Sequence, residues 1–210
     1  MGLKYIRCPP LPKLTKDLNR INYIDLTDQF DDNFNLISYA KAYIMGLETR
    51  IPYDRNTGEI IVYDCSRVNM NIIKGLTPTL FKKAIDVYLK GYSLRVAGLH
   101  FLFPPPGGIF LLGIAKTLIK PKLFERIHLH DSYESLHKLV PKELLPKNVG
   151  GDLPDIQVIT DEWYTVMKKN RDNLIELSKT RTDESKRIKN INDDEYFGSM
   201  HGSFKKLDVD

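Results

Sequence analysis

The sequence has few cysteines and no recognisable leader, and both shortages bear on where the chain works. Only Cys8 and Cys65 are present among 210 residues, whereas a disulfide scaffold carries more cysteines in a shorter chain. No positively charged and then apolar segment opens the sequence. We therefore expect a reducing, cytoplasmic compartment.

Long apolar runs and a strong charge of one sign are also lacking. The longest apolar run, 107–118, is interrupted near its end by Lys116 and Thr117, and a bilayer-spanning helix needs roughly 20 apolar residues. No transmembrane helix is expected. Lys and Arg number 31 against 27 Asp and Glu, and the two signs are interspersed, whereas nucleic-acid binding favours a basic stripe with aromatic residues. We expect no nucleic-acid partner.

No complete catalytic or metal-binding set is evident. Residues 198–202 lack the Gly-x-Ser-x-Gly nucleophile elbow, and no Gly-rich phosphate loop occurs. His128 and His130 face one side of a predicted strand and are able to chelate a metal, but only Asp131 and His137 lie near as third ligands. Structural histidines are the preferred interpretation. We predict a protein without enzymatic turnover, metal or cofactor.

The sequence does contain a regular alternation of strand and helix patterns. Strands are predicted where β-formers or continuous apolar runs occur, and helices where apolar residues recur about every 3.6 positions. The predicted strands are 21–26, 60–64, 94–103 and 126–130, and the predicted helices are 33–47, 77–92, 109–119, 133–139 and 160–177. This alternation is typical of an α/β fold with a mostly parallel sheet.

The alternation lies within one stretch of chain, and this fixes the domain prediction. Residues 1–18 are rich in proline and lysine, which indicates an extended lead-in. Residues 19–178 are predicted to form one domain, because a chain of this length supports one substantial core. Residues 179–210 form a polar tail whose aromatic residues, such as Phe197 and Phe204, suit docking on the domain or binding of a protein partner.

Three segments, taken in order, resemble one family. They are residues 94–100 (Leu-Arg-Val-Ala-Gly-Leu-His) with the prolines that follow, residues 122–130 (Lys-Leu-Phe-Glu-Arg-Ile-His-Leu-His), and residues 139–151, with two prolines and a closing Gly-Gly. The sequence thus resembles the CRAL-TRIO (Sec14-like) family, closest to the branch of the α-tocopherol transfer and retinaldehyde-binding proteins. The resemblance implies a three-layer α/β/α domain whose sheet floors an apolar cavity under a mobile lid helix.

The same resemblance implies a function. It predicts non-enzymatic binding and intermembrane transfer of a small hydrophobic lipid that is tocopherol-, retinoid- or phospholipid-like. Residues 109–119 fall where the family has its lid, and a helix that is apolar all round must lie against something apolar. A plain core helix is the alternative for this segment. For the whole chain, the alternative is a protein-interaction module whose cavity is filled by side chains.

The resemblance also implies which residues contact the lipid. They are apolar or aromatic with a few hydroxyls, as expected of a pocket for a lipid with one polar group, although each also suits a core. The predicted ligand-binding residues are Tyr63, Val68, Val87, Tyr88, Tyr92, Leu94, Val96 and Leu99, with Phe110, Leu111 and Ile114 of the lid.

A basic cluster is the last implied site. In the tocopherol-carrier branch such a cluster holds a phosphoinositide headgroup at the membrane, and Arg95, Lys122 and Arg126 match it. Ala97 and Phe124 stand where the branch has two further bases. The resemblance therefore implies phosphoinositide binding and peripheral contact with an anionic membrane, and a solvated basic face is the alternative.

The sequence departs from the family pattern in two further ways. The family usually has an asparagine before its prolines, where this chain has Phe103. The helical module that normally precedes the lipid domain does not fit within 18 residues, so we expect this sequence to be either that of a shortened family member or an incomplete product.

Overall fold

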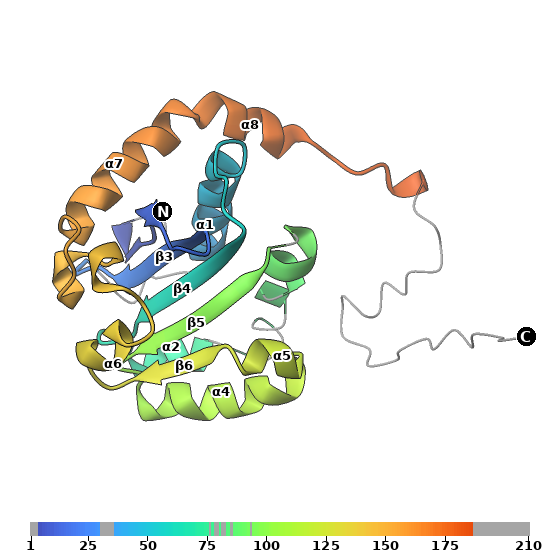
Figure 1. Ribbon diagram of the computed structural model, residues 1–210. Coiled ribbons are helices and arrows are strands. Elements are labelled where there is room, and N and C mark those ends of the chain that lie inside the picture. The colour runs from blue at the N-terminus through green and yellow to red at the C-terminus, as the bar shows by residue number, and fades with distance from the viewer. Residues whose placement is uncertain are drawn as a thin grey trace, which may run out of the picture.

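Figure 1 shows a computed structural model in which a twisted sheet is flanked by helices. The structure describes residues 4–29, 36–75, 77, 80, 83, 84, 86–92 and 94–186. The tail around Phe197 and Phe204, predicted to dock or to bind a partner, lies outside the described residues.

The sheet is mostly parallel, as the sequence predicts. Its strands are β1 (Ile6–Arg7), β2 (Pro10–Leu14), β3 (Asn19–Leu26), β4 (Gly58–Asp64), β5 (Val96–Leu102) and β6 (Ile127–His130). Strands β3, β4, β5 and β6 are parallel neighbours in that order, and β1 and β2 pair antiparallel with β3. The predicted α/β class is confirmed.

Helices connect and cover these strands. They are α1 (Leu36–Arg50), α2 (Met70–Gly75), a π-helix (Val87–Gly91), α4 (Pro106–Leu118), α5 (Pro121–Phe124), α6 (Tyr133–His137), α7 (Ile156–Lys169) and α8 (Arg171–Lys179), with short 3-10 turns at Lys142–Leu144, Lys147–Val149 and Glu184–Lys186. In Figure 1, α7 and α8 curve around the β3 side of the sheet, whereas α4 lies beside β6. The Ser132 hydroxyl accepts from the Ser135 N–H at 3.3 Å, so Ser132 caps α6.

The last predicted helix, 160–177, is wrong at its start and in its interior. Helix α7 begins at Ile156, because the Asp155 side chain accepts from the Gln157 N–H at 2.8 Å. Thr160 is not a cap; it lies fully buried within the helix and donates to the Ile156 carbonyl. The helix then ends at Asn170, and α8 follows as a separate element.

The proline-rich lead-in is part of the sheet. Residues predicted to precede the domain form β1 and β2, and Leu11 of β2 is fully buried. The Tyr164 hydroxyl of α7 donates to the Ile6 carbonyl at 2.9 Å, which fixes this segment against the last third of the domain. The hydrophobic core therefore begins before residue 19.

The sheet buries side chains on both faces, which explains its nearly continuous apolar strands. The first face carries Ile21, Tyr23, Val62 and Leu102, covered by residues 136–159. The second face carries Ile24 and Ile61 with Tyr5, Ile6, Cys8 and Leu26, and against it pack Tyr39, Tyr43, Tyr63, Val68, Ile72, Tyr88 and Leu99.

The closing Gly-Gly of the third motif has a steric reason. Gly150 adopts a left-handed conformation, with φ of 71°. A Cβ on Gly151 would lie 2.0 Å from the Leu145 carbonyl oxygen, which is an overlap. These glycines let the chain turn tightly beneath the buried Leu145 and Val149.

Two further observations concern membranes and thiols. Within the described ranges, no helix is both long and apolar enough to cross a bilayer. Cys8 and Cys65 are both free thiols, and burial raises the pKa of each to about 12.

Candidate lipid-binding site

The second face of the sheet is the candidate binding surface, and it is rich in tyrosine. Tyr39 and Tyr43 reach it from α1, Tyr63 from β4 and Tyr88 from the π-helix, and all four are only partly buried. The rings of Tyr63 and Phe101 stack with centroids 5.1 Å apart. Burial raises the pKa of Tyr63 to about 12, so its hydroxyl stays neutral at physiological pH. The face therefore offers flat apolar area with a few neutral hydroxyls.

The structure brings four of the predicted ligand-binding residues together and separates the others. Tyr63, Val68, Tyr88 and Leu99 share the second face. Three others lie elsewhere: Val87 is 44% exposed, Val96 is buried in β5 opposite Glu59, and Tyr92 donates to Glu48 at 2.6 Å. Leu94, which precedes β5, is half-buried.

The predicted lid corresponds to α4, which begins three residues earlier than expected. Its N-terminal turn packs on α2, where a Cβ on Gly107 would lie 3.2 Å from Ile73 Cδ1. Ile109 is 48% exposed and Phe110 71% exposed, so this turn shows two large apolar side chains to solvent. Phe110 was predicted to line the cavity, but it faces outward. The side chains of Leu111 and Ile114 lie outside the described residues.

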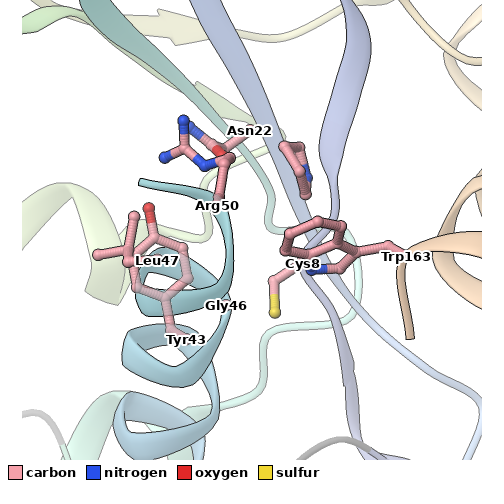
Figure 2. Close-up of a pocket in the computed structure, with 8 residues that line it drawn as sticks. Cys8, Asn22, Tyr43, Gly46, Leu47, Arg50 and Trp163 are labelled. Atoms are coloured by element: carbon pink, nitrogen blue, oxygen red, sulfur yellow. The ribbon is translucent and has the colours of Figure 1, made fainter. Parts of the chain in front are cut away.

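A hollow of about 400 Å³ occurs elsewhere, between β2, the end of α1 and α7. Pro10, Tyr53, Trp163 and Val166 are among its lining residues. A much smaller hollow of about 10 Å³ adjoins it, and Figure 2 shows Tyr43, Arg50, Cys8 and Trp163 around it. Neither is the cavity predicted between the sheet and α4.

A buried polar cluster, which the sequence did not predict, closes one end of the second face. Glu59 of β4 is fully buried, and its carboxylate accepts from Arg50 at 2.8 Å, from Asn56 at 2.8 Å and from Asn22. The Tyr88 hydroxyl donates to the same carboxylate at 3.4 Å. The only sequence signal is an acidic residue that opens an otherwise apolar strand.

The predicted basic cluster gathers at the start of two neighbouring strands. Arg95 precedes β5, Arg126 precedes β6, and Lys122 lies on α5, the short helix that ends just before Arg126. The Arg126 guanidinium donates to the Val96 carbonyl, which brings it beside Arg95. Arg95 and Lys122 are exposed. The three cations therefore share one edge of the domain.

The histidines form a stacked group on the first face. His100 of β5 and His130 of β6 are buried, and His100 Nδ1 lies 2.9 Å from His130 Nε2. His130 Nδ1 lies 2.9 Å from the Ser135 hydroxyl, and the His128 ring stacks on His100 with centroids 4.9 Å apart. In the described part of the chain, no three His, Cys, Asp or Glu side chains are arranged to hold a metal ion.

Comparison with known proteins agrees with this architecture. The profile of the CRAL/TRIO domain matches residues 8–151, which is more than half of the chain. The chain therefore belongs to the CRAL/TRIO family, a family of lipid-binding and lipid-transfer domains, and the resemblance seen in the sequence is confirmed.

Particular relatives share about a third or less of the aligned residues. The chain is 30% identical to Clavesin-2 of Homo sapiens over 124 residues, which cover 58% of this chain and 38% of that protein. It is 26% identical to the α-tocopherol transfer protein-like protein of Pongo abelii over 146 residues, which cover 68% of this chain and 42% of that protein. The crystal structure of Sfh5 superposes with a TM-score of 0.48 at 10% identity, covering 82% of this chain and 65% of that one. The chain thus spans less than half the length of these two curated relatives.

Proposed function

We propose that this protein is a non-enzymatic carrier that holds a small hydrophobic lipid on the second face and transfers it between membranes. The proposal is supported by a half-buried tyrosine-rich face and by an apolar helix, α4, whose first turn packs on α2 and exposes Ile109 and Phe110. A tocopherol-, retinoid- or phospholipid-like molecule suits such a face, because it combines a large apolar body with a polar end.

The exposed turn of α4 favours contact with a bilayer. Leaving a large apolar side chain in water instead of an apolar phase costs roughly 1.5–3 kcal/mol, and Ile109 and Phe110 are adjacent. Insertion of this turn among lipid tails recovers that free energy. Movement of α4 away from the sheet is then less costly on a membrane than in water, and lipid exchange is expected to take place there.

Transfer of a fluorescent lipid between vesicles tests this role. Ile109→Asp with Phe110→Asp should slow transfer while leaving the affinity for the lipid in solution nearly unchanged, because both side chains point to solvent. The matched control is Leu177→Asp, a partly exposed leucine of α8, which should not affect transfer. Equal slowing by the control, or a wild-type protein that retains no lipid in a native mass spectrum, would contradict the proposal.

The basic edge formed by Arg95, Lys122 and Arg126 supplies the attraction to an anionic membrane. Each basic residue near such a surface contributes about 1 kcal/mol, so Arg95→Glu with Lys122→Glu should weaken binding to phosphoinositide-containing vesicles by roughly tenfold or more. Lys168→Glu with Lys169→Glu on α7 makes the same charge change elsewhere. If both double variants weaken binding equally, the edge contributes only general charge.

A protein-interaction module with a filled cavity is the second candidate. The observation that favours it is the stacking of Tyr63 on Phe101, because side chains that pack on each other occupy space that a lipid requires. Solvent extraction of the purified protein separates the two functions, since only a carrier yields a stoichiometric lipid.

A further inference from the structure

The buried polar cluster of Glu59, Arg50 and Asn22 adjoins the second face through Tyr88, whose hydroxyl donates to Glu59. Tyr88 and Tyr43, which both pack on that face, stand between the cluster and the other tyrosines. Their ring centroids are 6.0 Å apart, and Tyr39 follows at 6.3 Å from Tyr43. The polar cluster and the aromatic surface are therefore continuous.

The charges of the cluster cancel. Arg50 pairs with Glu59 and also with Asp54 at 2.6 Å, and Asp54 pairs with Arg20 at 2.8 Å, so two guanidinium groups face two carboxylates. Although burial raises the pKa of Asp54, the hydrogen bonds from Arg20 and Arg50 bring it below its usual value, which keeps Asp54 ionised. An added phosphate or carboxylate would have no cation left to balance it, and burying an unbalanced charge is costly.

One hydroxyl beside the cluster lacks a partner. The Tyr43 hydroxyl is buried and makes no hydrogen bond of normal geometry within the described residues, although the Tyr88 hydroxyl lies near enough to interact with it. In Figure 2 it points toward the Arg50 end of α1, and Tyr43 lines the small hollow together with Asn22 and Arg50. Buried polar groups are nearly always bonded, so such an exception calls for an explanation. A ligand that supplies the missing partner is one.

We propose that the Tyr43 hydroxyl bonds the polar end of the carried lipid, and that this end is an uncharged hydroxyl, as in a long-chain alcohol or a phenol. The assignment rests on the proposed carrier function. The Tyr43 hydroxyl can both donate and accept a hydrogen bond. The hydroxyl of an alcohol or phenol can do the same, so the two groups can bond with either one as the donor. The tail of the lipid then runs along the aromatic surface toward Tyr63 and Leu99.

Binding of three probes with the same saturated tail tests the assignment: hexadecanol, palmitate and hexadecyl phosphate. The wild-type protein should bind hexadecanol at least about tenfold more tightly than the two anions. Tyr43→Phe should weaken hexadecanol binding about three- to tenfold, the effect of one hydrogen bond, and leave the binding of both anions unchanged. Tyr53→Phe, at an exposed tyrosine that follows α1 and lies away from the second face, is the matched control and should not change the preference.

A second measurement keeps the test sharp. Without lipid, Tyr43→Phe should be at least as resistant to urea as the wild type, because the substitution removes a buried group that lacks a partner. A clear loss of resistance means that the hydroxyl is already bonded within the protein, and this overturns the assignment. Binding of all three probes with equal affinity overturns it too, while lipid carriage stands. Failure to bind any of the probes removes both the assignment and the carrier function.

Discussion

Acidification should destabilise the domain through His100, and the burial of this residue sets the size of the effect. His100 is 3% exposed, and burial, followed by the neighbouring His128 and His130, lowers its pKa from 6.5 to about 3. Between these two pKa values the unfolded chain binds a proton at His100 that the folded chain does not. The contribution of neutral His100 to stability is therefore fully present above pH 6.5 and is lost as the pH falls toward 3. At about 1.4 kcal/mol per pH unit, about 2 kcal/mol is lost by about pH 5.

Urea unfolding of the wild type and of His100→Gln, near neutral pH and near pH 5, measures this loss. Glutamine retains a hydrogen-bonding side chain but does not titrate. Between neutral pH and pH 5, the free energy of unfolding of the variant should therefore fall by about 2 kcal/mol less than that of the wild type. The difference in the free energy of unfolding between the two proteins at neutral pH, where His100 is neutral in both states, reports any loss of packing. Asp54, whose pKa lies below its usual value through its bonds to Arg20 and Arg50 despite burial, does not titrate in this range. Identical pH dependence in the two proteins would refute the reasoning.

Three other substitutions have defined outcomes. Gly151→Ala places a Cβ 2.0 Å from the Leu145 carbonyl and should destabilise the fold by roughly 3 kcal/mol; a thermal midpoint within a degree or so of the wild type would contradict the overlap. Leu18→Asn should stabilise by about 1 kcal/mol in urea, because Leu18 is half exposed and left-handed, with φ of 57°, and a loss of stability would show that the side chain matters more than the backbone. Glu59→Gln, measured in the same way, should cost about 3–5 kcal/mol by leaving the buried Arg50 charge without one partner, and a neutral effect would show that the amide replaces the carboxylate.

The sequence predicts the parallel sheet because its strands are apolar on both faces. It does not predict β1 and β2, since proline is unfavourable in most strands and is tolerated at an edge. The break between α7 and α8 was also missed. Asn170 closes α7 with its own N–H bonded to the Val166 and Met167 carbonyls, and no proline or glycine marks the position.

One departure from the family pattern acquires a backbone reason. Phe103, where the family usually has asparagine, adopts a left-handed conformation with φ of 52°. Asparagine tolerates this region better than other non-glycine residues. Here the ring packs edge-on against Tyr133 with centroids 5.4 Å apart, which helps to offset the strain.

The candidate site was only partly predictable. Family resemblance supplied Tyr63, Val68, Tyr88 and Leu99, which lie on one face. The polar cluster was not found, because Asn22 and Tyr88 reach Glu59 from 37 and 29 residues away in the chain. Such pairings depend on strand register and on the π-helix, neither of which a pattern of apolar residues specifies.

The prolines of the first edge limit how this molecule can associate with others. Within the described residues β2 pairs only with β3, and Pro10 and Pro12 of β2 have no N–H to offer to an incoming strand. At the opposite edge, β6 is only four residues long. Sheets with open edges extend from molecule to molecule and aggregate, but this sheet offers a poor template for such growth. A protein that exposes apolar side chains such as Ile109 and Phe110 is thereby protected from one common route to fibres.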